Sequence, residues 1–168
     1  AEINKLRLNN GEAIPRLSDA LDALPHALFN IDIKRADGTK PLANFLNTHP
    51  QAHRVVAASF VGARLKELKS LVKKPVPVTA VQNDIIRIML IGLGLPLKRP
   101  DVVAVQVPIS HNGIPIATKW FVRQCHKLDI KIHVWTIDDE AVMRWLIDLG
   151  VDGVMTDKPS LLKEVCLD

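Results

Sequence analysis

Short apolar runs recur along the chain, each with the length and composition of a β-strand. Their starts lie roughly 20–30 residues apart, which is the spacing of successive strand–helix units in parallel α/β proteins. Six runs are predicted to be strands: Ala27–Lys34, Arg54–Phe60, Val76–Val81, Val102–Pro108, Lys131–Ile137 and Gly153–Thr156. Because strands buried on both faces are rich in Val and Ile, we predict a parallel sheet that is flanked by helices.

Helical periodicity fills several of the intervals between these runs. After Asp138–Glu140, which supply a cap and negative charge at a helix start, apolar residues recur at helical spacing as far as Leu149. Gly150 is placed to end that helix. Further helices are predicted from Gly62 to Val72, after Ser18 and after Ser160.

The length and composition suit one folded domain, residues 1–168. A chain of 168 residues with 48% hydrophobic residues has enough apolar side chains for a sizeable core. The apolar run from Ile85 to Leu97 is too short and too interrupted to cross a bilayer. We therefore predict neither a linker nor a membrane span.

The charge pattern narrows the class of partner. The formal net charge is +4, but 22 basic and 18 acidic residues are interleaved, aromatic residues make up 4%, and tyrosine is absent. Nucleic-acid binding is therefore not predicted, and the charge supports only a mild attraction to anionic ligands. Cys125 and Cys166 lie far apart, which favours reduced thiols and a cytoplasmic location. A signal peptide upstream of Ala1 stays compatible with the sequence.

Asp32 and Lys34 place an acid and an ammonium in the apolar run of the first predicted strand. Side chains alternate along a strand, so these two share one face while Ile31 and Ile33 share the other. Burying such charges is costly unless they pair, bind a metal or serve a polar site. Two interpretations stay open: a metal ligand and a cation beside an anionic substrate, or an ion pair at a strand end.

Other residues near strand ends also have two interpretations. Trp135 and Phe60 either wall a ligand pocket or pack as ordinary core, and packing is the commoner role. Asp157 either reaches a site or caps the local turn. Cys125-His126 lacks partners at zinc spacing, so no zinc site is predicted there. His111 lies in a loop that either faces a ligand or makes a turn, and the turn is the commoner role.

Taken in order, these motifs resemble the glycerophosphodiester phosphodiesterase family. Residues 14–17 are similar to its "I-P-x-L" lead-in, residues 30–34 to its "N-I-E-I-K" strand, residues 59–60 to its "S-F" strand end and residues 134–136 to its "V-W-T". Residues 150–159, G-V-D-G-V-M-T-D-K-P, are similar to its closing "G-V-D-G-I-x-T-D-x-P", which is the most specific of these motifs. The resemblance extends from about Ile14 to Val165.

The resemblance implies a TIM barrel with its active site at the C-terminal mouth of the strands. It also implies a phosphoric diester hydrolase of lipid and glycerol metabolism, which releases an alcohol and glycerol 3-phosphate from glycerophosphodiesters with the help of Mg²⁺ or Ca²⁺. Asp32 matches the family's metal-binding glutamate, although it is one methylene shorter, which puts coordination distance or metal preference in question. Lys34 matches the catalytic lysine that offsets phosphate charge. Phe60 and Trp135 match substrate-binding positions.

The sequence departs from the family in its first segments. The "H-R-G" strand, the "E-x-D" pair and the "H-D" strand, which carry both catalytic histidines and the other metal carboxylates, do not occur. A closed barrel has eight strands and takes about 250 residues, whereas we predict about six strands. We therefore interpret the chain as an incomplete barrel that lacks the first two strands and is inactive alone. Its exposed sheet edges are expected to aggregate, to form a homo-oligomer or to borrow the missing strands.

Two alternative functions remain at this point. One is a catalytically dead remnant of the family that acts as a ligand-binding or assembly protein. The other is an unrelated phosphate-binding barrel enzyme, such as an isomerase, which would need a glycine-rich phosphate loop that Gly150 and Gly153 do not form convincingly. Catalytic histidines and an E-x-D pair encoded upstream of Ala1 would favour the hydrolase over the remnant.

Overall fold

Short strands alternate with helices in a computed structural model that describes residues 5–167. The strands are β1 (Phe29–Asp32), β2 (Val55–Ala58), β3 (Ala104–Val107), β4 (Ser110–His111), β5 (Ile114–Pro115), β6 (Lys131–Val134) and β7 (Gly153–Val154). The α-helices are α1 (Leu17–Ala23), α2 (Thr39–Thr48), α3 (Gly62–Leu71), α4 (Gln82–Gly92), α5 (Lys119–Lys127), α6 (Glu140–Leu149) and α7 (Pro159–Leu167). Two single-turn 3₁₀ helices lie at Ala36–Gly38 and Ala52–Arg54.

The main strands pair in parallel and in chain order, as predicted. β1 pairs with β2, β3 with β6, and β6 with β7. Between β2 and β3, the predicted strand Val76–Val81 joins the sheet through isolated parallel bridges from Val78 and Thr79. Pro75 and Pro77 shorten the regular pairing here, because proline has no N–H to donate to a neighbouring strand.

The two faces of β1 differ as the alternation of its side chains predicts. Ile33, which follows the strand, is 4% exposed in the hydrophobic core, and Ile31 packs against that core. Asn30 is exposed and Asp32 is half-buried on the opposite face. Helices thus cover the isoleucine face, and the polar face lines the concave side of the sheet.

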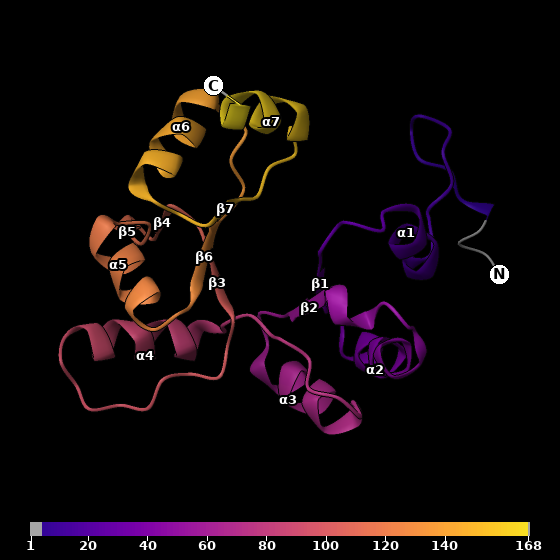
Figure 1. Cartoon of the computed structure of the whole chain (residues 1–168), viewed down its shortest axis with the longest axis horizontal. Coiled ribbons are helices and arrows are strands. Elements are labelled where there is room, and N and C mark those ends of the chain that lie inside the picture. The colour runs from indigo at the N-terminus through magenta and orange to yellow at the C-terminus, as the bar shows by residue number, and fades with distance from the viewer. Residues whose placement is uncertain (1–4, 168) are drawn as a thin grey trace.

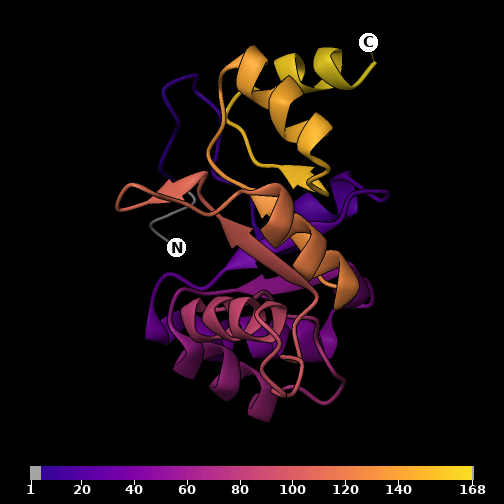
Figure 2. The same ribbon diagram turned by 90° about the vertical axis from the view of Figure 1, so that its left-hand side faces the viewer.

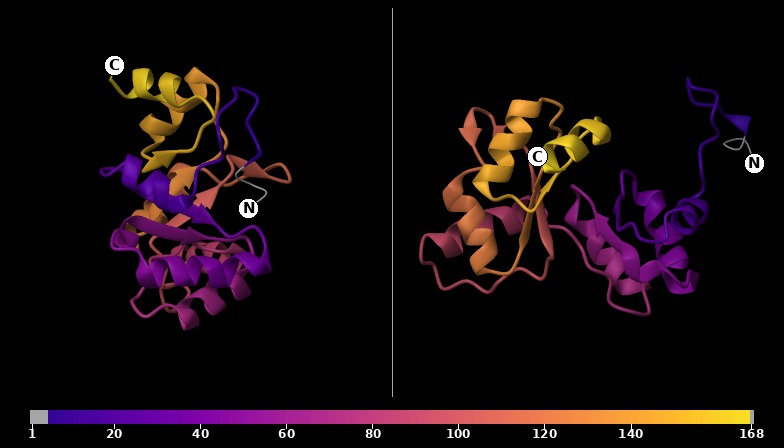
Figure 3. Two further views of the ribbon diagram at one scale, coloured as in Figure 1. Left: turned by 90° about the vertical axis from the view of Figure 1, so that its right-hand side faces the viewer. Right: turned by 45° about the horizontal axis from the view of Figure 1, so that its top comes forward.

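The helices run around the sheet in an arc that is open between α7 and α1 (Figure 1). Neighbours along the arc contact each other, as α2 does α3, α4 does α5, and α6 does α7. Within residues 5–167, β1 and β7 are the two edge strands of this sheet. The segment of residues 5–15 extends away from the helices at the α1 end of the arc (Figure 3). The architecture is therefore a TIM-barrel type that is not closed in the described part of the chain.

Local signals are clearest at the two ends of α6. Asp139 caps α6 by accepting a hydrogen bond from the Val142 N–H (3.0 Å), and Gly150 ends the helix with φ 89°. The helices α1 and α7 each begin one residue before the serines that were predicted to start them. None of the described helices combines the length and apolar character that a bilayer crossing requires.

The loop after β3 forms the β4–β5 hairpin, which projects beyond the end of that strand (Figure 2). Asn112 and Gly113 both have positive φ, 50° and 78°, which two-residue hairpin turns require. His111 therefore borders a turn, as predicted, and lies at the same end of the sheet as the candidate site below.

Candidate functional site

The Asp32–Lys34 pair lies at the C-terminal end of β1. Lys34 Nζ is 2.6 Å from Asp32 Oδ2, with side-chain exposures of 73% for the lysine and 26% for the aspartate. The other carboxylate oxygen, Asp32 Oδ1, is buried and accepts no hydrogen bond. A buried polar atom without a partner costs free energy, so this oxygen is a candidate ligand for a bound cation or hydrogen-bond donor.

Two aromatic rings from other strand ends extend the contact between Asp32 and Lys34. Lys34 Nζ lies 5.5 Å from the centroid of the Phe60 ring, which follows β2, in cation–π geometry. The Phe60 and Trp135 rings meet edge to face, with centroids 6.1 Å apart and planes at 86°. Trp135 follows β6, and its peptide bond to Thr136 is cis. The structure thus brings the four predicted residues together, and we call them the Asp32 site.

The contact between Phe60 and Trp135 shows how the sheet curves. β3 and the bridged residues Val78 and Thr79 lie between β2 and β6 in the sheet. Rings at the ends of β2 and β6 can meet only because the sheet curls toward its concave side, as the wall of a barrel does. Curvature of the sheet, which no local sequence signal encodes, therefore assembles the Asp32 site.

Side chains from the β2–α3 turn and the first turn of α3 support the end of β1. Ser59 Oγ donates a hydrogen bond to the Ile33 carbonyl (3.1 Å). Arg64 Nη1 donates to the Ile33 and Lys34 carbonyls, at 3.0 Å each. Arg64 is not predictable from the sequence, because nothing in its local pattern separates it from the other solvent-facing cations of that helix.

A second link joins the ends of β6 and β7. Asp138 Oδ1 accepts hydrogen bonds from Thr156 Oγ1 (2.7 Å) and the Asp157 N–H (2.8 Å), and these two donors lower the pKa of the Asp138 carboxyl. Asp138 was predicted to help cap α6, and Asp139 alone does so. Thr156 Oγ1 closes the local turn by accepting from the Lys158 N–H (2.9 Å).

A contrasting carboxylate, Asp152, lies at the opposite end of the strands, just before β7. Its Oδ1 is 2.9 Å from Lys131 Nζ, and its Oδ2 is 2.8 Å from His126 Nε2 and 2.9 Å from the Ile132 N–H. Burial alone would raise the pKa of Asp152, but these three hydrogen bonds outweigh it and lower that pKa. We call these residues the Asp152 cluster; it gives His126 a partner that sequence spacing did not reveal.

His133 packs closely against β7 on the concave face of the sheet. A side chain added at Gly153 would place its Cβ 2.8 Å from His133 Cδ2, so any larger residue there would force the His133 ring to move. Burial lowers the pKa of His133, which favours the neutral imidazole. This contact explains one glycine of the closing motif by packing alone.

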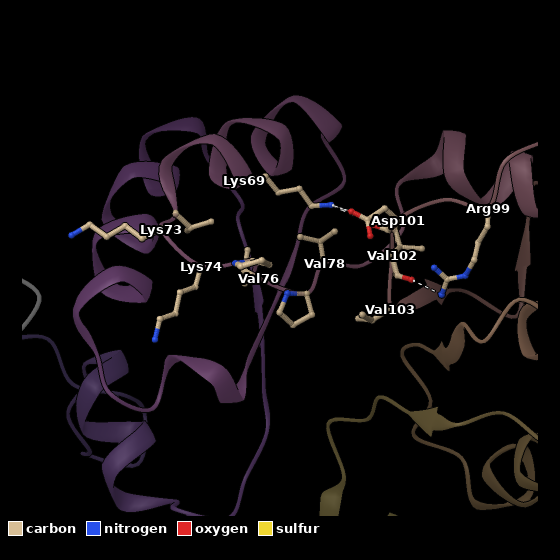
Figure 4. A pocket seen from close by; sticks show the side chains of 12 residues that line it. Lys69, Lys73, Lys74, Val76, Val78, Arg99, Asp101, Val102 and Val103 are labelled. Carbon is tan, nitrogen blue, oxygen red and sulfur yellow. Dashed lines mark hydrogen bonds and ion pairs between the residues drawn. The ribbon is translucent and has the colours of Figure 1, made fainter.

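A pocket of about 580 Å³ lies at the N-terminal ends of the strands, away from the Asp32 site (Figure 4). Of its four cations, Lys69 is paired with Asp101 at 2.7 Å. Arg99 donates to the carbonyls of Leu128, Pro100, Val102 and Asp129. The side chains of Lys73 and Lys74 point away from the other lining residues, in different directions (Figure 4). The four cations therefore do not converge on one point, as they would around a single anion.

The Asp32 site fits part of a divalent-metal site. Mg²⁺ and Ca²⁺ bind oxygen ligands, and Asp32 Oδ1 is an unpaired carboxylate oxygen of the right chemistry. Such ions need about six or more ligands, and residues 5–167 contain no group of three His, Cys, Asp or Glu side chains that could hold one. The described residues fit one ligand position and not a complete shell.

Comparisons with known proteins agree with this geometry. Residues 1–161 match the Glycerophosphoryl diester phosphodiesterase family. The chain is 33% identical to the probable glycerophosphodiester phosphodiesterase 2 of Mycobacterium tuberculosis over 99% of its own length and 65% of that protein's. Another relative, a glycerophosphodiester phosphodiesterase from Caldanaerobacter subterraneus, is 28% identical and is spanned over 61% of its length. The chain thus covers less than two thirds of these relatives.

Solved structures share the fold. A glycerophosphodiester phosphodiesterase from Parabacteroides distasonis superposes with a TM-score of 0.68 at 21% identity, covering 98% of this chain and 68% of that one. A phosphodiesterase from Oleispira antarctica, solved with its product sn-glycerol-3-phosphate, gives 0.63 at 20% identity, covering 94% and 63%. These likenesses confirm the predicted barrel-type architecture.

Proposed function

Because the chain belongs to the glycerophosphoryl diester phosphodiesterase family, we propose that it forms part of a barrel that hydrolyses glycerophosphodiesters to an alcohol and glycerol 3-phosphate. The observation that carries the proposal is the continuous contact from Asp32 through Lys34 and Phe60 to Trp135. These residues come from the ends of three strands, where barrel enzymes place their chemistry. The proposal covers the activity, the substrate and the roles of the residues.

Lys34 is the catalytic residue of this proposal. Its ammonium is held between a carboxylate and an aromatic face, and most of the side chain remains open to a ligand. An ammonium at hydrogen-bonding distance from a phosphoryl oxygen offsets the negative charge that builds up during hydrolysis. Phe60 and Trp135 form a right-angled apolar wall beside it, which suits the carbon skeleton of a glycerol unit.

Asp32 holds the divalent cation, Mg²⁺ or Ca²⁺, through the oxygen that lacks a protein partner. Such a cation, when bound, supplies positive charge that polarises a phosphoryl oxygen. Asp32 meanwhile orients the Lys34 ammonium through its other oxygen. One carboxylate thus supports both positive charges of the site.

The site is completed by strands outside the described residues. β1 and β7 are the edge strands of the open arc, and a barrel of this class has eight strands where six pair here. We propose that two strands, supplied by a longer natural protein or by an assembly partner, fill the gap and contribute the missing ligands and acid–base groups. The chain alone is then inactive and prone to self-association through its edges.

Binding of sn-glycerol 3-phosphate tests the substrate class on the chain itself. The indole N–H signals of Trp120, Trp135 and Trp145 are separate reporters in an NMR titration with this phosphate and Mg²⁺. We expect the Trp135 signal to move and the other two to stay, because only Trp135 contacts the Asp32 site. Lys34→Ala should weaken the response at least tenfold, with Lys66→Ala as the matched surface control.

Three outcomes of these measurements would count against the proposed substrate, site or activity. Movement of the Trp120 or Trp145 signal, or a titration unchanged by Lys34→Ala, would place phosphate binding elsewhere. In a protein that turns over glycerophosphocholine, activity that survives Asp32→Ala would contradict the site. Specific phosphate binding with no turnover, even after the two strands are restored, would instead favour the ligand-binding remnant.

A further inference from the structure

We infer that Arg64 is a positioning residue, which holds the end of β1 so that Lys34 stays against Asp32 and Phe60. The inference rests on the proposed function, because it concerns how the same site is kept in shape. Arg64 contacts neither of the acidic oxygens nor the aromatic rings in any hydrogen bond, ion pair or ring contact of the described residues, so its influence runs through the backbone of β1.

The contacts of Arg64 fall where the strand pairing ends. Asp32 is the last residue of β1 paired with β2, opposite Ala58, and the Ile33 N–H still donates to the Ala58 carbonyl (2.8 Å). Beyond that point the sheet holds the chain no longer. Arg64 Nη1 reaches the next two carbonyls, those of Ile33 and Lys34, at 3.0 Å each.

Ser59 reinforces the same position. Its Oγ donates to the Ile33 carbonyl (3.1 Å) and accepts from the Val61 N–H (3.2 Å), which ties β1 to the turn that begins α3. Arg64 lies in the first turn of α3 and is half-buried, so its guanidinium is set on a helix rather than on a free loop. The backbone of Lys34 is therefore fixed by a rigid element of the fold.

Lys34 needs such support, because its side chain is long, flexible and 73% exposed. An exposed lysine loses rotamer freedom when it is held in one geometry, and its ion pair is weak when either end can move. Fixing its carbonyl removes the backbone part of that freedom. A site held within a fraction of an ångström depends on residues of this supporting kind.

A neutral substitution of Arg64 is the sharpest test. Arg64→Met keeps the length of the side chain without its donors, and Lys66→Met on the same helix is the matched control, since that lysine is exposed. Two NMR signals are followed: the Lys34 side-chain ¹³Cε signal without ligand, and the Trp135 indole signal during a sn-glycerol 3-phosphate titration. Arg64→Lys, which retains one ammonium donor, is the second variant.

We expect Arg64→Met to shift the Lys34 ¹³Cε signal toward that of a free lysine and to weaken phosphate binding about tenfold, the lower end of the loss when a supporting contact is removed. Arg64→Lys should give an intermediate loss, and Lys66→Met none. In a Lys34→Ala background, Arg64→Met should cost no further affinity, because its effect acts through Lys34.

An unchanged Lys34 signal in folded Arg64→Met would overturn the inference, as would an equal loss of affinity in the Lys34→Ala background. If Arg64→Met does not fold, a Lys34 signal unchanged in Arg64→Lys overturns it in the same way. The proposed function fails separately, when the wild-type chain shows no response of Trp135 to the phosphate while the Lys34 signal still depends on Arg64.

Discussion

The two ends of the sheet each carry an aspartate paired with a lysine, and the two aspartates differ in how many protein partners their oxygens have. At Asp152, three donors occupy both carboxylate oxygens. At Asp32, one lysine occupies one oxygen, and the other is buried without a partner. The Asp152 side chain is 17% exposed and the Asp32 side chain is 26% exposed, so burial alone does not separate them.

The difference teaches how to tell a structural carboxylate from a functional one. A carboxylate whose two oxygens are both hydrogen-bonded within the protein needs no ligand to satisfy it, and it stabilises the fold by joining elements. A carboxylate with a buried free oxygen costs stability and is retained where a ligand completes it. The position at the C-terminal mouth of the strands agrees with the second role for Asp32.

The largest expected effect is on cation binding at Asp32. Asp32→Asn removes the charge but keeps the shape, so the weak binding of Mn²⁺, an oxygen-seeking probe for the Mg²⁺ position, should be lost at this site. The unfolding free energy should change little, because the one ion pair that the substitution removes is to a lysine that is 73% exposed. Electron paramagnetic resonance of free Mn²⁺ measures the affinity, and denaturant titration measures the stability.

Asp152→Asn should give the reverse result. It weakens three hydrogen bonds and discharges their acceptor, so we expect a loss of about 2 kcal/mol of unfolding free energy, typical of a hydrogen-bonded charged group. Mn²⁺ affinity should stay within twofold of wild type. A loss of unfolding free energy in Asp32→Asn, with none in Asp152→Asn, would contradict this assignment of the two carboxylates. The wild-type chain should also lose the Asp152 contribution as pH falls through the lowered pKa of that carboxyl.

A smaller effect is expected from His133, between the two ends. Because burial lowers its pKa in the fold, the unfolded chain binds the proton first as pH falls below about 6.5. Stability is therefore full above that pH and declines as pH falls toward the folded pKa. His133→Asn should flatten this part of the stability curve in urea titrations from pH 7.5 to 5. A slope that persists in the variant would assign the effect to another group.

The smallest effect concerns the thiol next to the Asp152 cluster. Burial, with the charge of Asp152 second, raises the pKa of Cys125 to about 12, whereas Cys166 is exposed. At pH 8 a maleimide should modify Cys166 alone in the native chain, as intact mass shows. Asp152→Asn should speed modification of Cys125 severalfold by loosening this end of the sheet, and Asp32→Asn should not. Equal rates in the two variants would mean that the Asp152 cluster does not hold this end closed.

The fold was largely predictable because local signals repeat. Alternation in β1, the helical spacing that ends at Gly150 and the runs of Val and Ile predicted the parallel strands and four of the helices, whereas α2, α4 and α5 were not predicted individually. Hydrophobicity predicted a regular strand over Val76–Val81, but Pro75 and Pro77 reduce its pairing to isolated bridges. The separate contact of Asp138 could not be predicted from the sequence, because its partner, Thr156, lies 18 residues away.

The candidate site was predictable in its members and not in its geometry. Asp32, Lys34, Phe60 and Trp135 stood out as strand-end residues, and their mutual contact depends on the curl of the sheet. Arg64 could not be predicted, because in the sequence an arginine that binds distant carbonyls has the same pattern as a solvated arginine on a helix surface. Long-range contacts of this kind become visible only in three dimensions.

Paramagnetic broadening by Mn²⁺ tests the central claim most directly. In ¹H–¹⁵N spectra of the chain, the account predicts that sub-stoichiometric Mn²⁺ first broadens the amides around Asp32 and its strand partner Ala58, and that Asp32→Asn abolishes this pattern. Broadening centred on Asp152, or a pattern around Asp32 that survives Asp32→Asn, would contradict it.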